Sequence, residues 1–209
     1  MTARATARRK LGWSSAIAGT LALLFAGGRY ALGSVEASRA RQAWAEASAH
    51  QAVVSAKAAV IRDEQVSRAE GAAVARLVIP SIGLDEVVLE GTSGRTLNAG
   101  PGHIAWSPLP GAQGNAIISA HRDRHFRNFE RLKVGDTITT ELRTRTTTWV
   151  VVNVHIVDKD TRALVRTSDT TLTLTTCWPI RMVGTAPDRL IVTAKPVAAV
   201  KREARIVGR

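Results

Sequence analysis

Residues 171–179 read TLTLTTCWP and contain Cys177, the single cysteine of this 209-residue chain. Leucine and threonine alternate along the stretch, which predicts a half-buried strand with Leu172 and Leu174 on one face and Cys177 on the other. Proline supplies no backbone N–H to a sheet, so regular pairing should end near Pro179 and leave the thiol beside a loop. Catalytic side chains are common at strand ends beside loops. The other interpretation is that this lone cysteine is a small apolar residue buried in the core.

Short runs typical of strands, separated by turn residues, lie on both sides of this stretch. We predict strands at residues 76–80, 86–89, 115–120, 136–142, 148–157, 171–177 and 189–195, and helical turns at 95–99 and 129–133. Because no long helices alternate with these runs, the pattern indicates an all-β sandwich or barrel. The Gly- and Pro-rich stretch 91–114 and the segment 178–188 are predicted to be long loops that line a groove.

The N-terminal segment has the composition of a membrane anchor. Residues 11–28 carry no charge, and four basic residues precede them within residues 1–10. This apolar length is at the short end of what spans a bilayer, and the basic flank predicts a cytoplasmic N-terminus with everything after the anchor outside. We therefore expect a single-pass anchor at 11–33. A cleaved signal peptide is the alternative, but its apolar region is usually shorter and no clear cleavage site follows.

Between the anchor and the β-rich part, residues 34–74 are rich in Ala with interspersed Glu, Arg and Gln, a composition that favours helix. If residues 34–70 are fully helical, they form a stalk on the order of 55 Å long. The folded domain is expected at 75–198, and residues 199–209 form a basic tail.

The net charge of +12 is concentrated at the ends of the chain, because residues 75–198 hold fifteen basic and eleven acidic side chains. A nucleic-acid-binding domain would instead show a dense basic face with interleaved aromatic residues. We therefore exclude nucleic acid as a partner.

A cysteine nucleophile needs a nearby base or positive charge. His121 ends the run NAIISAH as Cys177 ends its own, and Arg189 opens the run RLIVTAK twelve residues after the cysteine. A fixed arginine can stabilise an oxyanion in acyl transfer. Two other interpretations stay open: residues 121–125 (HRDRH) form a solvated charged turn, or His121 and His125 bind zinc, for which no four-ligand set is evident.

The joint pattern resembles the sortases, membrane-anchored cysteine transpeptidases of bacterial envelopes. The similar motifs are TLTTC (173–177), the strand end AH (120–121) and PDRLIV (187–192), and the resemblance covers about residues 75–197. The stretch 108–136 is most similar to the class D and Gram-negative branches. One departure is that AH replaces the usual GH.

This resemblance implies a closed eight-stranded β-barrel with His121, Cys177 and Arg189 as the catalytic set. The thiolate would attack the Thr carbonyl of an LPXTG-like sorting signal, and an amine from a cell-wall peptide or a protein would resolve the thioester. Thr175, Thr176 and Trp178 are the expected substrate-binding residues. No cofactor or metal is expected, and the catalytic domain would be extracellular or periplasmic. The alternatives are a hydrolytic cysteine peptidase of the same fold and a membrane-tethered β-barrel binding module.

Overall fold

The structure, a computed structural model, describes residues 35–47, 69–160 and 164–198, together with residues 20, 21, 23, 24, 28 and 33. The expected basic N-terminus (1–10), most of the expected anchor (11–33), residues 48–68 of the expected stalk and the tail (199–209) lie outside these residues. Within the part that is described, no helix is both long enough and apolar enough to cross a membrane.

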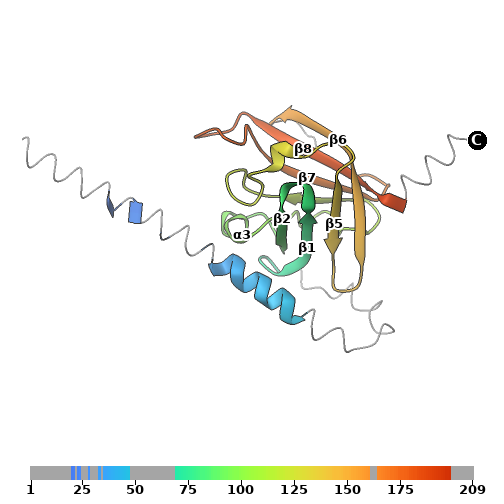
Figure 1. Cartoon of the computed structure of the whole chain (residues 1–209), viewed down its shortest axis with the longest axis horizontal. Helices are drawn as coiled ribbons and strands as arrows, with labels where there is room; N and C mark the ends of the chain where they lie inside the picture. Colours follow the sequence, from blue (N-terminus) through green and yellow to red (C-terminus); the bar gives the residue numbers. More distant parts are fainter. Residues whose placement is uncertain are drawn as a thin grey trace, which may run out of the picture.

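Eight strands of the described residues form a closed barrel (Figure 1). In chain order they are β1 (Ala73–Ile79), β2 (Leu84–Glu90), β3 (Gly102–His103), β4 (Asn115–Ser119), β5 (Thr137–Glu141), β6 (Thr146–Asp158), β7 (Thr171–Trp178) and β8 (Asp188–Pro196). Around the barrel the order is β1-β2-β3-β4-β7-β8-β6-β5, and β5 pairs with β1 to close it. The β2–β3 and β4–β7 pairs are parallel, and the other neighbours are antiparallel. The predicted all-β barrel is confirmed.

Seven of these strands overlap the runs predicted from the sequence. Strand β3 lies inside the stretch 91–114, which we predicted to be a loop. The prediction missed this strand because two residues are too few to show a periodic pattern. The two expected helical turns are present as α3 (Gly94–Ala99) and the 3₁₀ turn η3 (Phe129–Arg131), and a further 3₁₀ turn, η2 (Pro80–Ile82), joins β1 to β2.

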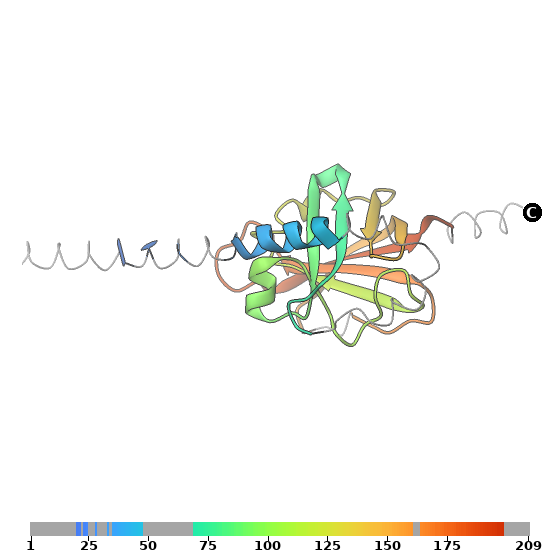
Figure 2. The same ribbon diagram turned by 90° about the horizontal axis from the view of Figure 1, so that it is seen from below.

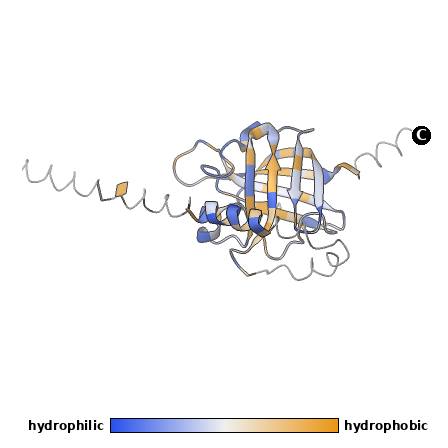
Figure 3. Ribbon diagram, turned by 60° about the horizontal axis from the view of Figure 1, so that its bottom comes forward, coloured by the Kyte–Doolittle hydropathy of each residue, from blue (hydrophilic) through white to orange (hydrophobic). Residues whose placement is uncertain are grey.

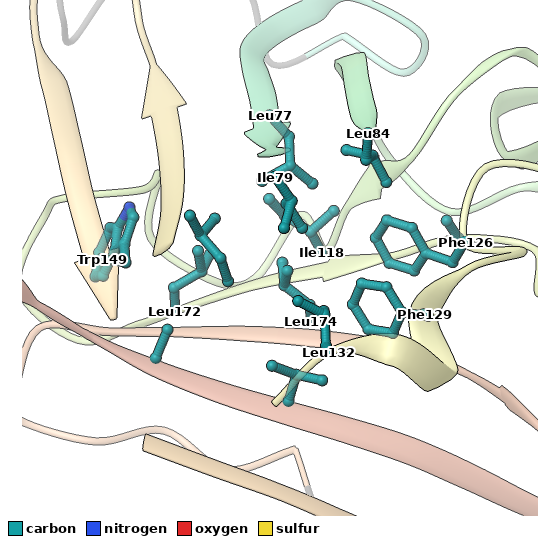
Figure 4. Close-up of a cluster of buried hydrophobic side chains, with 14 of the residues drawn as sticks. Leu77, Ile79, Leu84, Ile118, Phe126, Phe129, Leu132, Trp149, Leu172 and Leu174 are labelled. Atoms are coloured by element: carbon teal, nitrogen blue, oxygen red, sulfur yellow. The ribbon is translucent and has the colours of Figure 1, made fainter. Parts of the chain in front are cut away.

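The barrel interior is filled by alternate strand residues together with the aromatic side chains near η3 (Figure 4). In β1, Leu77 and Ile79 are fully buried, as the period-two pattern of a strand requires. Phe126 and Phe129 stack in parallel, with ring centroids 4.1 Å apart, and cover one end of the core.

Strand β7 is buried on both faces, so the predicted half-buried pattern is wrong. Leu172 and Leu174 point into the core as expected. On the opposite face, Thr173 donates from Oγ1 to Asn115 Oδ1 (2.8 Å), and Asn115 Nδ2 in turn donates to the carbonyl of Val165 (2.9 Å). The segment that precedes β7 therefore folds back over the outer face of β7, which the alternation of residues within the strand could not show.

The helix of residues 35–47 lies along the outside of the barrel (Figure 2). Trp44 is buried against Val87 and Leu89 of β2 and Ala99 of α3. Much of the ribbon of this helix has the colour of hydrophilic residues (Figure 3). This part of the predicted stalk thus packs on the barrel through one apolar side.

We expect the Phe129→Ala substitution to lower the free energy of unfolding by about 3–5 kcal/mol, because it leaves a cavity beside Phe126 in a fully buried site. Urea denaturation followed by circular dichroism measures this. Val183→Ala is the matched control, since Val183 is 97% exposed and its truncation should change stability by less than about 0.5 kcal/mol. A loss below about 1 kcal/mol for Phe129→Ala would contradict the stacked packing.

Candidate active site

Cys177 lies at the penultimate position of β7, and the strand ends at Trp178, just before Pro179, as the sequence predicts. The side chain is partly exposed and forms no disulfide. By alternation it projects from the outer face of the barrel, opposite to the core-facing Leu174. The thiol therefore stands at the rim of the barrel, on a rigid strand and beside the loop of residues 179–187.

Arg189 stands directly across from Cys177 in the antiparallel β7–β8 pair. Residues that face each other in such a pair project from the same side of the sheet. Here Arg189 Nη1 donates a hydrogen bond to Cys177 Sγ over 2.8 Å. A guanidinium group beside the sulfur has the charge that a thiolate needs in order to be stable.

His121 reaches the same rim through the parallel pairing of β4 and β7. The last paired residues are Ser119 and Thr175, and Ala120 continues the ladder by donating its N–H to the carbonyl of Thr175 (3.2 Å). His121 and Cys177 follow this last pair by two residues each, so both come directly after the paired parts of neighbouring strands.

A tight turn fixes the backbone of His121, because the N–H groups of Arg124 and Phe126 both donate to its carbonyl. Burial lowers the pKa of His121, the charge of Asp123 raises it, and the charges of His125 and Arg124 lower it again. The net pKa lies below the ordinary value for histidine. The imidazole is consequently neutral at neutral pH and able to accept a proton there.

The three expected substrate-binding residues differ in their surroundings. Thr176 is buried and donates from Oγ1 to the carbonyl of Ala120 (2.8 Å), which ties the end of β7 to the end of β4. Thr175 is also buried, and its Oγ1 finds no hydrogen-bond partner among the described residues. Trp178 is partly buried and packs against the core. Thr176 therefore holds the two strand ends in register.

The charged sequence that follows His121 is more than a solvated turn. Arg122 donates to the carbonyls of Met182 (2.9 Å) and Gly184, which belong to the loop between Cys177 and Arg189. Arg122, which follows His121, thus holds the loop between Cys177 and Arg189 in place. This role of Arg122 could not be predicted from the sequence, because an arginine in a run of charges gives no sign of a distant backbone partner.

Within the described ranges, no group of three or more His, Cys, Asp or Glu side chains is placed to hold a metal ion. His125 does not complete a pair of ligands with His121, since its Nδ1 faces the carboxylate of Glu86 at 3.2 Å. The site therefore offers a nucleophile, a cation and an imidazole, which is the set of groups that acyl transfer requires.

Comparison with known proteins agrees with this geometry. The family model described as "Sortase domain" matches residues 77–197. Sortase D of Bacillus subtilis (strain 168) is 36% identical over 129 residues, which are 61% of this chain and 65% of that protein. The chain thus spans slightly less than two thirds of the length of this relative.

Two solved structures are also similar. The structure of a Clostridium perfringens Sortase D5 transpeptidase has a TM-score of 0.67 at 26% identity and matches 78% of this chain and 99% of its own. The catalytic domain of B. anthracis SrtD has a TM-score of 0.54 at 33% identity, with 63% and 91% covered. Because the family model spans more than half of the residues and its region includes the whole rim described above, this chain is a member of the sortase family.

Proposed function

We propose that this protein is a cysteine transpeptidase that cleaves an LPXTG-like sorting signal and joins the resulting acyl group to an amine. The observation that carries the proposal is the 2.8 Å contact between Arg189 Nη1 and Cys177 Sγ. The parallel β4–β7 pairing, which ends two residues before His121 and Cys177, supports it. A lone cysteine with both a cation and an imidazole at hand is suited to nucleophilic catalysis.

In the proposed mechanism, the Cys177 thiolate attacks the carbonyl carbon of the Thr in the sorting signal, and negative charge develops on the carbonyl oxygen. Arg189, already at the sulfur, stabilises that oxyanion. His121, which has taken up the proton of the Cys177 thiol, donates that proton to the leaving amine as the peptide bond breaks, which leaves a thioester on Cys177. An acceptor amine then attacks the thioester, His121 takes up the proton of that amine, and the new amide leaves with the thiolate restored.

We further propose that the protein is attached to the membrane through residues 11–33, with the barrel on the outer side. The uncharged run 11–28 and the four basic residues before it support this orientation. Leu21, Leu23 and Leu24, which are among the described residues of this segment, are helical, apolar and exposed. Attachment there would place the enzyme among envelope proteins that carry sorting signals.

The test uses residues 34–209, which keep the docked helix of residues 35–47 and omit the apolar segment. The protein is incubated with a panel of LPXTG-like peptides, with and without excess triglycine, and examined by intact mass and chromatography. We expect an acyl adduct on Cys177 and an amide product that forms only with triglycine. A product that is entirely the hydrolysed acid at saturating amine would instead identify a peptidase, and no adduct with any peptide would contradict acyl-transfer chemistry.

A further inference from the structure

Arg122 joins the two chain segments that carry the candidate catalytic groups. It comes directly after His121, at the start of the turn that follows β4. Its Nη2 donates to the carbonyls of Met182 (2.9 Å) and Gly184, which lie 60 and 62 residues later in the chain. Both carbonyls belong to the loop of residues 179–187, which directly follows β7. One guanidinium group therefore ties the end of β4 to the loop after β7.

His121 lies between two residues that are tied to β7 and to the loop after it. On one side, Ala120 donates its N–H to the carbonyl of Thr175 (3.2 Å) and accepts at its own carbonyl from Thr176 Oγ1 (2.8 Å). On the other side stand the contacts of Arg122 with the loop. Strand pairing between β4 and β7 ends before His121. The position of His121 at the rim therefore depends on these two flanking ties as well as on its own turn.

The contacts of Arg122 with the loop are not explained by folding stability alone. Its second terminal nitrogen, Nη1, is buried and has no hydrogen-bond partner among the described residues. A buried donor without an acceptor has lost its hydrogen bonds to water, which offsets part of what Nη2 gains from the two carbonyls. A side chain of similar length without polar atoms would not have this cost. The net contribution of Arg122 to stability is therefore expected to be small.

The loop of residues 179–187 has a second side-chain contact, which does not involve the turn after His121. Arg181 donates from Nε to Glu130 Oε1 (3.1 Å), and its Nη2 lies 3.1 Å from the same oxygen. The Arg181 side chain is 75% exposed, and ion pairs of such exposed groups contribute little. Without the contacts of Arg122, the loop would depend on this weak surface pair between its two ends.

We propose that Arg122 is a positioning residue: by holding the loop of residues 179–187 against the turn after β4, it keeps His121 within reach of the Cys177 sulfur. The inference rests on the proposed function, in which His121 takes up the proton of the thiol and then donates it to the leaving amine. Both transfers need the imidazole at hydrogen-bond distance, so a small displacement of His121 slows both. The effect of Arg122 therefore falls on the chemical steps rather than on peptide binding.

The test measures kcat and KM of the full-length protein in detergent micelles, with the LPXTG-like peptide that the unsubstituted protein cleaves fastest. Arg122→Met keeps the length of the side chain but removes every donor. We expect kcat to fall by about 10- to 100-fold, the size of effect that a misplaced catalytic group produces, with KM changed by less than about threefold. The melting temperature should fall by less than about 4 °C, as for a minor loss of stability. Arg122→Lys keeps a donor for the two carbonyls and should recover part of kcat.

Two other arginines provide the controls. Arg127→Met removes an exposed arginine of the same segment and should leave kcat within about twofold of the unsubstituted value. Arg181→Met removes the pair with Glu130 but leaves Arg122 in place, so kcat should fall by less than about threefold. An equal loss of kcat in Arg181→Met and Arg122→Met would contradict a specific action on His121. A loss in Arg122→Met that appears as a higher KM, or that accompanies a large fall in melting temperature, would also overturn the inference.

A second measurement does not depend on turnover. Backbone ¹⁵N relaxation of the same protein reports how rigidly the amides of His121, Met182 and Gly184 are held. We expect their order parameters to fall in Arg122→Met and to stay unchanged in Arg127→Met. Order parameters that remain above about 0.8 at all three amides in Arg122→Met would refute the positioning role. If the unsubstituted protein cleaves no peptide, the proposed function fails, and the relaxation measurement still decides whether Arg122 holds His121 in position.

Discussion

Cys177→Ala is expected to abolish peptide cleavage, with a loss on the order of 10⁴-fold or more, because the proposed mechanism forms the acyl intermediate on the sulfur of this residue. The described part of the chain has Cys177 as its only thiol, and the neighbouring Arg189 has no nucleophilic atom. Cleavage is measured by chromatography with a sorting-signal peptide, and intact mass should show no adduct on the variant.

The control for Cys177→Ala is a measurement of its folding stability. Because the side chain is small and partly exposed, its loss should lower the free energy of unfolding by less than about 1 kcal/mol. A well-folded Cys177→Ala protein that keeps more than about one per cent of the cleavage rate would refute the nucleophile assignment.

Arg189→Ala is expected to lower kcat/KM by about 10² to 10³, the usual cost of losing one oxyanion-stabilising group. The loss should be mainly in kcat if Arg189 acts on the developing charge rather than on the bound peptide. Arg189→Lys should recover only part of the rate, since lysine keeps the positive charge but lacks the planar fork with which arginine can donate to the sulfur and, in the proposed mechanism, to the oxyanion.

Arg95→Ala is the control for Arg189, because Arg95 is a strongly exposed arginine on α3 that pairs with Glu36. Its removal lowers the net charge by the same amount and should change kcat/KM by less than about threefold. A decrease in Arg189→Ala no larger than that of the control would contradict a role at the reaction centre.

The sequence predicts those parts of the fold that depend on patterns of neighbouring residues. Alternation located seven strands, and the proline after Trp178 marked the end of β7. The position of Arg189 was predictable for a similar reason, since a run that opens twelve residues after the cysteine could return as the antiparallel neighbour of β7, and the register does pair the two residues.

What the sequence did not predict depends on contacts between distant segments. Strand β3 has only Gly102 and His103, and its pairing is specified by its neighbours in the barrel. The outer face of β7 is covered through Asn115 and Val165, which no pattern inside β7 could indicate. The polar contacts of Arg122 and His125 likewise reach partners about forty or more residues away in the chain.

The parallel pairing of β4 and β7 has a practical consequence for handling the protein. Ala120 and Thr176, which lock the two strand ends together, are 56 residues apart in the chain. Before the barrel closes, the thiol has neither Arg189 nor the end of β4 beside it, so a partly folded chain lacks the groups that activate the cysteine in the proposed mechanism. The rate of adduct formation in a refolding mixture should therefore be proportional to the amount of protein with a closed barrel. Measuring it during preparation serves as an assay of correct folding.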